Sequence, residues 1–214
     1  MSQQSSIVSG IAVPLLRDYM DAMTVCPRTP AEKGGAATQG GRETVEPEAA
    51  FAALRFDDNG VARPDFVLNR PEFAGARILI SRKSFCCGSA REHSVWALLN
   101  FGIQCVIAES FGPLFYGNCF KNGLIPIMLP PAEIADLAQE VGPGGKAAML
   151  SLDLRACTIT TASGRTVPFE MPAFRLKQLV EGLDEIDMTL KLTDKISAFH
   201  AAGQKSKPWL YTQS

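Results

Sequence analysis

The sequence is poor in the residues on which many enzymes depend. Its 214 residues include two histidines, His93 and His200, and two tryptophans. A Ser-His-Asp hydrolase needs a histidine that a third group holds beside the serine. His93 follows Ser89 by four residues on one local segment, which is a poor placement for that role. A serine hydrolase is therefore disfavoured. A P-loop nucleotidase is disfavoured as well, because no Gly-rich loop ends in Gly-Lys-Ser or Gly-Lys-Thr.

Strong net charge and long apolar runs are missing as well. The formal net charge is −1, with 46% hydrophobic and 20% charged residues. Such a balance gives no indication of nucleic acid or a membrane surface as a partner. No apolar run approaches membrane-spanning length, and residues 1–6 lack the basic and apolar regions of a secretion signal. We expect residues 1–214 to form a single cytoplasmic domain with a substantial core.

Cysteines are present, but not in a spacing that metal sites use. None of the six forms a Cys-x-x-Cys pair. Scattered cysteines in a domain of this size are more often buried free thiols than ligands or disulfides, and they fit a reducing cytoplasm. We therefore expect no metal in this chain. A metal or thiol module built on the adjacent pair Cys86-Cys87 is the weaker alternative.

One stretch, residues 85–93, has the composition of an anion site. The apolar run at 76–81 in front of it favours a strand, and residues 94–101 behind it favour a helix that ends at a glycine. A turn between a strand and a helix offers free backbone N–H groups and the positive end of the helix dipole. These groups suit a bound carboxylate or phosphate.

Gly88, Ser89 and Ala90 are the small residues on this predicted turn. Arg91 adds a planar guanidinium that can bind a carboxylate through two hydrogen bonds, and Ser89 adds a hydroxyl for proton exchange. The simpler alternative is an ordinary turn in which the serine is the N-cap of the helix.

Around this stretch, strands and helices alternate, which predicts a parallel, layered α/β core. We expect strands at 7–14, 76–82, 104–108 and 124–129, and helices at 91–101, 111–122 and 131–138. A β-meander at 148–154, 157–160 and 166–169 and helices at 174–181 and 194–202 are expected to follow. Residues 28–50 have no apolar periodicity and predict a mobile loop, and the tail after 203 is expected to be frayed.

The 88–93 segment, Gly-Ser-Ala-Arg-Glu-His, resembles the Gly-Ser-Ser-Arg-Glu-His signature of the swivelling domain in the aconitase superfamily. More closely, the chain resembles the small subunit of 3-isopropylmalate dehydratase. Further motifs of that family recur in order across residues 52–200, among them Asp57-Asp58-Asn59-Gly60, Pro64-Asp65-Phe66-Val67-Leu68-Asn69, Phe115-Tyr116-Gly117-Asn118 and Leu124-Ile125-Pro126-Ile127.

This resemblance implies a fold, an activity and a partner. The fold would be the layered β/β/α swivelling domain. The activity would be that of an iron–sulfur hydro-lyase that isomerises 2-isopropylmalate to 3-isopropylmalate by dehydration and rehydration, in leucine biosynthesis. The chain would hold no cofactor and would be active only with a large subunit, which carries a [4Fe–4S] cluster. The substrate would be a small dicarboxylate.

The resemblance also implies roles for particular residues. Ser89, as an alkoxide, would be the catalytic base. The substrate-binding residues would be Gly88, Ser89, Ala90 and Arg91, and the residues that support them would be Asp21, Glu92 and His93.

At three places the chain departs from the family pattern. Asp21 keeps the first aspartate of an Asp-Thr-Asp motif, but Met23 stands in place of the second. Ala90 replaces the second serine of the signature, and Arg28-Thr29-Pro30 replaces the start of a substrate-contacting loop. Two alternatives therefore stay open. One is a hydro-lyase subunit for another 2-alkylmalate, such as methylmalate, with citraconate as the unsaturated acid. The other is a non-catalytic paralogue that binds the large subunit.

Overall fold

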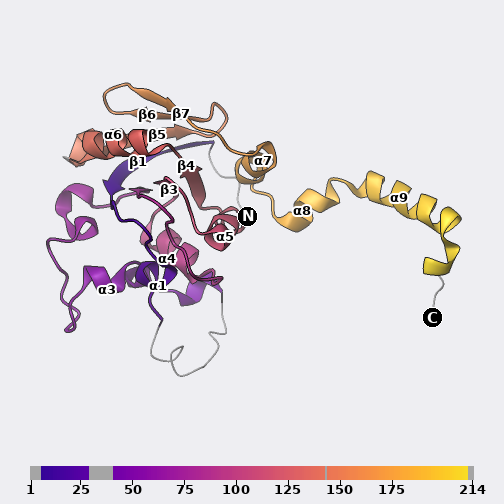
Figure 1. Ribbon diagram of the computed structural model, residues 1–214, viewed down its shortest axis with the longest axis horizontal. Coiled ribbons are helices and arrows are strands. Elements are labelled where there is room, and N and C mark those ends of the chain that lie inside the picture. Colours follow the sequence, from indigo (N-terminus) through magenta and orange to yellow (C-terminus); the bar gives the residue numbers. More distant parts are fainter. Residues whose placement is uncertain (1–5, 29–40, 143, 212–214) are drawn as a thin grey trace.

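The computed structural model describes residues 6–28, 41–142 and 144–211 of the chain. Within them, seven strands form one curled sheet in the order β4-β3-β2-β1-β5-β6-β7 (Figure 1). The strands are β1 (Ile7–Pro14), β2 (Ile78–Ile80), β3 (Cys105–Ala108), β4 (Ile125–Met128), β5 (Met149–Asp153), β6 (Thr158–Thr161) and β7 (Thr166–Pro168).

The two halves of the sheet differ in direction, and the sequence reflects this. β1 to β4 are parallel, whereas β5 to β7 join β1 from the other side in antiparallel pairs. β2 and β3 are buried at every position, as expected for parallel strands that are covered on both faces. β5 to β7 alternate in burial because one of their faces meets solvent.

β1 belongs to both halves of the sheet, and its burial pattern changes along its length. Where it pairs with β5, exposed Ser9 follows buried Val8. Where it pairs with β2, the neighbours Ala12 and Val13 are both buried. A single strand thus passes from a one-sided environment to a two-sided one.

The helices of the body surround this sheet. α6 packs against β1 and β2, while α4 packs against α1 and α5 (Figure 1). The helices are α1 (Ala22–Val25), α3 (Ala52–Arg55), α4 (His93–Phe101), α5 (Pro113–Asn122), α6 (Pro131–Val141), α7 (Ala173–Glu181), α8 (Glu185–Leu190) and α9 (Thr193–Ser206). Short 3₁₀ helices lie at Arg42–Thr44, Pro47–Ala49, Val67–Asn69, Pro71–Phe73, Gly145–Ala148 and Pro208–Leu210.

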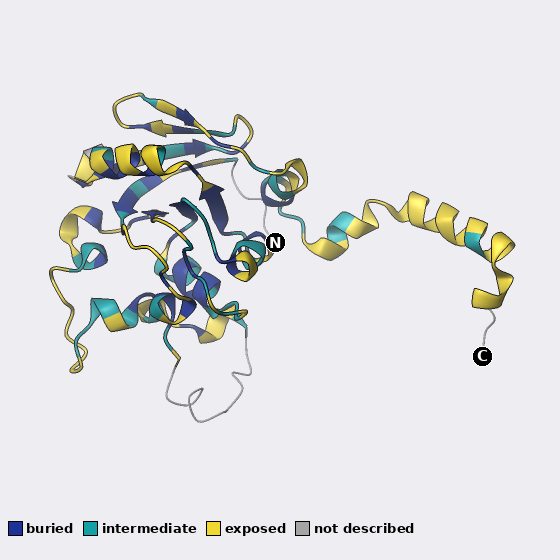
Figure 2. Cartoon of the chain, viewed as in Figure 1, coloured by how far each residue is buried: buried dark blue, intermediate teal, exposed yellow. Residues whose placement is uncertain are grey.

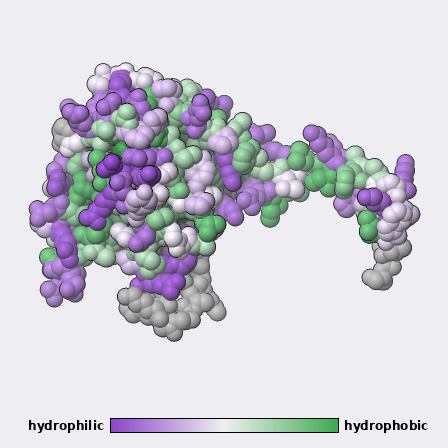
Figure 3. Space-filling model, viewed as in Figure 1, coloured by the Kyte–Doolittle hydropathy of each residue, from purple (hydrophilic) through white to green (hydrophobic). Residues whose placement is uncertain are grey.

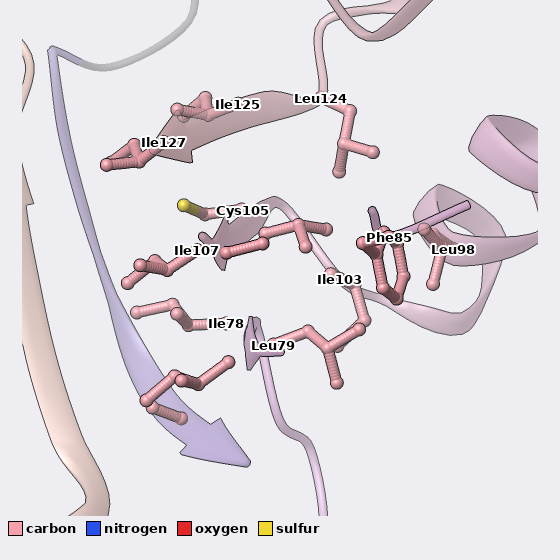
Figure 4. Close-up of a cluster of buried hydrophobic side chains, with 14 of the residues drawn as sticks. Ile78, Leu79, Phe85, Leu98, Ile103, Cys105, Ile107, Leu124, Ile125 and Ile127 are labelled. Carbon is pink, nitrogen blue, oxygen red and sulfur yellow. The ribbon is translucent and has the colours of Figure 1, made fainter. Parts of the chain in front are cut away.

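The core contains buried side chains of the parallel strands and of the helices α4, α5 and α6. Figure 4 shows the side chains of Ile78, Leu79, Ile107 and Ile127 projecting from neighbouring strands, with Phe85 close to α4. All five are at most 1% exposed. Burial of each such side chain contributes about 1.5–3 kcal/mol relative to its exposure. Phe85, which begins the predicted anion stretch, is thus fixed in the core.

Most predicted elements are found, with differences at their ends. The strand predicted at 76–82 is confined to β2, and the helix predicted at 111–122 begins at Pro113, because proline favours the first helical position. The last helix extends to Ser206, and α8 was not predicted. Within the predicted loop, residues 29–40 lie outside the described residues, whereas Arg42–Thr44 and Pro47–Ala49 pack against α4.

Candidate functional site

The segment between β2 and α4, residues 81–92, is irregular and is held at two points. Phe85 forms an isolated parallel bridge with Phe111, just before α5. Cys87 forms another with Asp21, just before α1. Two connections from distant parts of the sequence therefore hold the segment in place.

Three residues of this segment have left-handed backbone conformations. The φ angles are +54° at Ser84, +55° at Cys86 and +82° at Gly88. Such angles cost little at glycine, but about 1–2 kcal/mol at other residues. Conformations of this kind persist where the surrounding structure holds them, and they cluster at functional sites. The turn is therefore a strained and well-defined feature of the fold.

The α1 segment is tied to the turn by hydrogen bonds. The N–H of Cys87 donates to the carbonyl of Met20 at 3.2 Å, and the N–H of Ala22 donates to the carbonyl of Cys87 at 2.8 Å. The buried hydroxyl of Ser94, in the first turn of α4, donates to the carbonyl of Ala22 at 3.1 Å. These bonds place Asp21 and the start of α4 beside the same turn.

On the other side, Gly112 allows α5 to approach the turn closely. A Cβ atom at this position would lie 2.5 Å from the carbonyl oxygen of Cys86 and 2.8 Å from the Cα of Cys87. Both of these are backbone atoms, which cannot move as a flexible side chain can. Only glycine therefore fits between the N-terminus of α5 and the turn without a shift of the backbone.

Ser89 is half-buried and lines an open pocket of about 240 Å³. Its hydroxyl oxygen accepts a hydrogen bond from the N–H of Arg91 at 3.2 Å. The N-cap of α4 is Glu92, which makes no side-chain capping bond. The simpler alternative, in which Ser89 caps the helix, is therefore wrong, because the helix begins two residues later than predicted, at His93.

The turn has backbone donors available for an anion. Within the described part of the chain, the N–H groups of Gly88, Ser89 and Ala90 donate to no other atom. The carbonyl of Ala90, by contrast, accepts a hydrogen bond from the side chain of Asn118 at 3.3 Å. The hydrogen bond from Asn118 anchors the peptide unit that follows these three donors, and the bond from Ala22 to the carbonyl of Cys87 anchors the one that contains the N–H of Gly88.

Arg91 lies beside α1. Its Nη2 donates to the carbonyl of Cys26 at 3.3 Å and lies 3.4 Å from the sulfur of Met23. Cys26 is the C-cap of α1, where the helix dipole favours a cation. A thioether is a weak acceptor without charge, so Met23 does not neutralise the guanidinium.

The residues predicted to support the site have the following contacts. The carboxylate of Asp21 accepts from the N–H of Thr24 at 2.7 Å and caps α1. The ring of His93 lies 5.0 Å from that of Trp96, between centroids. Glu92 occupies the N-cap of α4. All three therefore have contacts that order the two helices next to the turn.

The adjacent cysteines are not arranged as a metal centre. Burial raises the pKa of the Cys86 thiol to about 12, so the thiol stays protonated at neutral pH. A metal-ligating cysteine must be a thiolate. Among residues 6–28, 41–142 and 144–211, no three His, Cys, Asp or Glu side chains gather where a metal ion would be held. The described cysteines are free thiols.

The sequence did not predict the opposite wall of the pocket. Pro113 and Leu114, at the start of α5, line it together with Ala90 and Ser89. The aromatic spacing of this helix indicated core, which holds for Phe115 at 2% exposed, whereas Leu114 is 58% exposed. The exposure of Leu114 could have been predicted from the helical period, which places it away from the face that contains Phe115.

The sheet order and this turn define a class of protein, the swivelling domain of the aconitase type. Residues 7–132 match the family described as the aconitase C-terminal domain, which confirms the predicted fold class. A crystal structure of 3-isopropylmalate dehydratase from Methanocaldococcus jannaschii covers 91% of this chain and 99% of its own, with a TM-score of 0.59 and 25% identity.

Similar sequences specify the family within this class. A 3-isopropylmalate dehydratase small subunit from Jannaschia sp. is 48% identical over 160 residues, which are 75% of this chain and 79% of that protein. The protein of the same name from Rhodospirillum centenum is 38% identical over 207 residues, 97% of this chain and 98% of its own. The chain belongs to the family of 3-isopropylmalate dehydratase small subunits, as predicted from its sequence.

Proposed function

We propose that this chain, as the small subunit of a 3-isopropylmalate dehydratase, contributes half of an active site that a large subunit completes. Membership of the family bears out the predicted function, a hydro-lyase subunit of leucine biosynthesis. The observation that supports its half of the site is a serine hydroxyl and free backbone donors lining one open pocket.

Our proposal locates the enzyme in the cytoplasm. Every helix in the described ranges is too short or too polar to span a bilayer.

In this proposal the N–H groups of Gly88, Ser89 and Ala90 hold a carboxylate of the substrate. Arg91 binds a carboxylate from the side of α1. Backbone donors and a guanidinium together neutralise an anion far better than either does alone in a partly desolvated site. A dicarboxylate of the malate type thereby finds complementary charge on this chain.

Ser89 is the proposed base. As an alkoxide it removes the proton from the carbon next to a carboxylate, and the electron pair of the broken C–H bond forms the double bond as the hydroxyl of the neighbouring carbon leaves. A free serine is far too weak a base for this step. The N–H groups of the turn and the charge of Arg91 would lower the free energy of the alkoxide.

The metal chemistry belongs to the partner in this proposal. A [4Fe–4S] cluster on the large subunit would act as a Lewis acid toward the hydroxyl and a carboxylate of the substrate. The described residues of this chain fit that division. Burial raises the pKa values of the Cys86, Cys105 and Cys119 thiols, and no group of three His, Cys, Asp or Glu side chains among the described residues could hold a metal ion.

The pocket also bears on the substrate. Ala90, Pro113 and Leu114 give it an apolar wall next to Ser89. Such a wall suits the alkyl branch of a 2-alkylmalate, because burying each methylene contributes about 0.8 kcal/mol. The wall favours 2-isopropylmalate over the smaller methylmalate. Ala90 lacks the hydroxyl of the family's second serine, which removes a contact of about 1 kcal/mol.

The test is the Ser89→Ala variant in the complex with the large subunit. We expect dehydration, followed by the absorbance of the unsaturated acid, to fall by about 10²–10⁴-fold, the usual contribution of a general base. Binding of the large subunit should be unchanged. Ala90→Ser is the matched control, since it alters the adjacent position but keeps the base, and it should retain activity.

Turnover by Ser89→Ala at the wild-type rate would refute the assignment of the base. A wild-type complex that assembles but converts no 2-alkylmalate in a panel from methylmalate to isopropylmalate would instead identify the chain as a non-catalytic paralogue.

A further inference from the structure

The last described part of the chain forms an arm, residues 183–211, that extends away from the body (Figure 1). α8, α9 and the 3₁₀ helix Pro208–Leu210 contain no buried residue among them. Figure 2 shows the arm almost entirely in the colour of exposed residues, in contrast to the body. Ion pairs at its root, Lys121 with Glu185 and Lys191 with Glu181, connect the arm to the body.

The arm carries an apolar face. In α9, the helical period places Ile196 and Phe199 on the same side as Leu192, which precedes the helix. Phe199 is 72% exposed, and Trp209 and Leu210 at the end of the arm are each 67% exposed. Hydrophobic residues recur along the arm in Figure 3. This amount of exposed apolar surface on one segment is typical of an interaction site.

The arm lacks the packing that would stabilise its helices. Helices shorter than about 12–15 residues are marginal in water, and most helical stability in proteins comes from packing of the apolar face. α8 has 6 residues and α9 has 14. Packing of its apolar face against another molecule would therefore stabilise the arm.

A polar cleft of about 560 Å³ lies at the root of the arm, between α4, α5 and α7. Arg42, Lys121 and Gln178 line it, together with Gly182, where the arm begins. Gln178 is 4% exposed, and its carbonyl oxygen accepts from Arg175 at 3.1 Å. That bond fixes the orientation of the Gln178 amide. The Nε2 atom of Gln178 is buried and has no hydrogen-bond partner.

A buried donor without an acceptor costs about 1–3 kcal/mol, so this cleft is suited to an acceptor from outside the chain. The cations of Arg42 and Lys121 at the same cleft favour a carboxylate as that acceptor. The cleft and the arm are continuous through Gly182 and through the ion pair of Lys121 with Glu185. One partner can therefore engage both.

We propose that the arm and this cleft form the docking surface for the large subunit, which would offer an apolar groove to the arm and an acidic side chain to the cleft. The proposal rests on the function proposed above. The matches to small subunits from Rhodospirillum centenum and Polaromonas sp. span 97% of this chain, so they include the arm. A segment that these two small subunits share with the chain suits a role toward the large subunit. If the cleft of a second copy faced this one, it would bring the same cations, since no acidic residue is among those that line the cleft.

The test compares two full-length double variants that add the same charge to α9. Ile196→Glu with Phe199→Glu places two carboxylates on the apolar face. Ala198→Glu with Ala201→Glu places them on the opposite face of the same helix. We expect the first pair to weaken binding of the large subunit by about 30-fold or more, as for a central aromatic anchor, and the control pair to bind like the wild type.

Thermal unfolding of the isolated chain provides the folding control. Since the arm lies outside the core, both double variants should have the same melting temperature as the wild type. In the complex, amide hydrogens of residues 185–206 should exchange much more slowly than in the free chain. Lys121→Glu should also weaken binding, because it reverses the charge at the cleft.

Equal affinity of the two double variants for the large subunit would overturn the proposal. So would slow exchange of the arm in a free chain that sediments as a dimer, which would identify a second copy as the occupant. If the wild-type chain bound no large subunit at all, the proposed function itself would fail.

Discussion

At the scale of single residues, the turn depends on the absence of a side chain at Gly112. Gly112 has an ordinary backbone conformation, so its requirement for glycine is purely steric. The strain at Ser84 and Cys86 can persist because backbone contacts from two sides hold the segment. The chemistry proposed for Ser89 thus relies on the close fit of the backbone around the turn.

Gly112→Ala tests this dependence. The new methyl group would collide with the backbone of Cys86 and Cys87, so we expect the free energy of unfolding to fall by about 1–3 kcal/mol, as for other overpacked sites. Urea denaturation measures the change. The matched control is Gly117→Ala, in the same helix, where an added Cβ meets nothing within 4 Å. There we expect stabilisation by about 0.5–1 kcal/mol, because alanine replaces a glycine inside a helix. Equal effects of the two substitutions would contradict the steric explanation.

At the scale of elements, α6 and the β-meander are joined by charge as well as by packing. Arg165, just before β7, donates to Glu133 at 2.9 Å and to Glu140 at 3.2 Å, both on α6. Glu140 also accepts from the hydroxyl of Ser163, in the turn between β6 and β7. Hydrogen bonds from Ser163 and Thr161, followed by Arg165, lower the pKa of Glu140. The carboxylate of Glu140 therefore links a helix to the far edge of the sheet.

The lowered pKa makes this link sensitive to pH in one direction. A carboxyl group with a lowered pKa in the folded state stabilises the fold above its unfolded pKa of about 4.3, and this contribution is lost as pH falls through the folded pKa. We expect Glu140→Gln to lower the melting temperature at pH 7, and the difference from wild type to shrink below pH 4. Thermal unfolding across this range measures it. Asp136→Asn, on the exposed face of the same helix, controls for the loss of one carboxylate from α6. A deficit of Glu140→Gln that stays constant with pH would contradict the proposed cause.

At the scale of the whole molecule, the chain has the features of one subunit of an enzyme. The proposed catalytic serine lines an open pocket, and the arm extends away from the body. Both features are expected of a chain that functions in a complex. The relatives that share its full length are themselves named as subunits.

This division of labour predicts that the isolated chain retains no iron. The pKa values of Cys86, Cys105 and Cys119 are raised by burial, so these thiols resist the deprotonation that iron ligation requires. We expect elemental analysis of the purified chain, after anaerobic incubation with iron and sulfide, to find far less than one iron per chain. The complex with the large subunit, treated in the same way, is the positive control. Stoichiometric iron and sulfide on the single chain would place the cluster in this subunit and contradict the proposal.

Periodicity in the sequence determined the local elements. Apolar runs predicted the strands, and the alternation of these strands with helices predicted that they are parallel. The small residues around Ser89 also pointed to a turn before a helix. The extent of the helix and the role of the serine as a cap were wrong, since the hydrogen bond of Ser89 is made within the turn.

Contacts between distant segments were decided only by the tertiary structure. The bond of Cys87 to Met20, the approach of Gly112 to Cys86 and the location of Met23 beside Arg91 each join residues that are 26 to 68 positions apart. The local apolar pattern predicts which residues are buried, but it does not specify which distant residue each one contacts. The sequence therefore supplied the chemical groups of the site, and the packing of α1, α4 and α5 around one strained turn decided which of them meet.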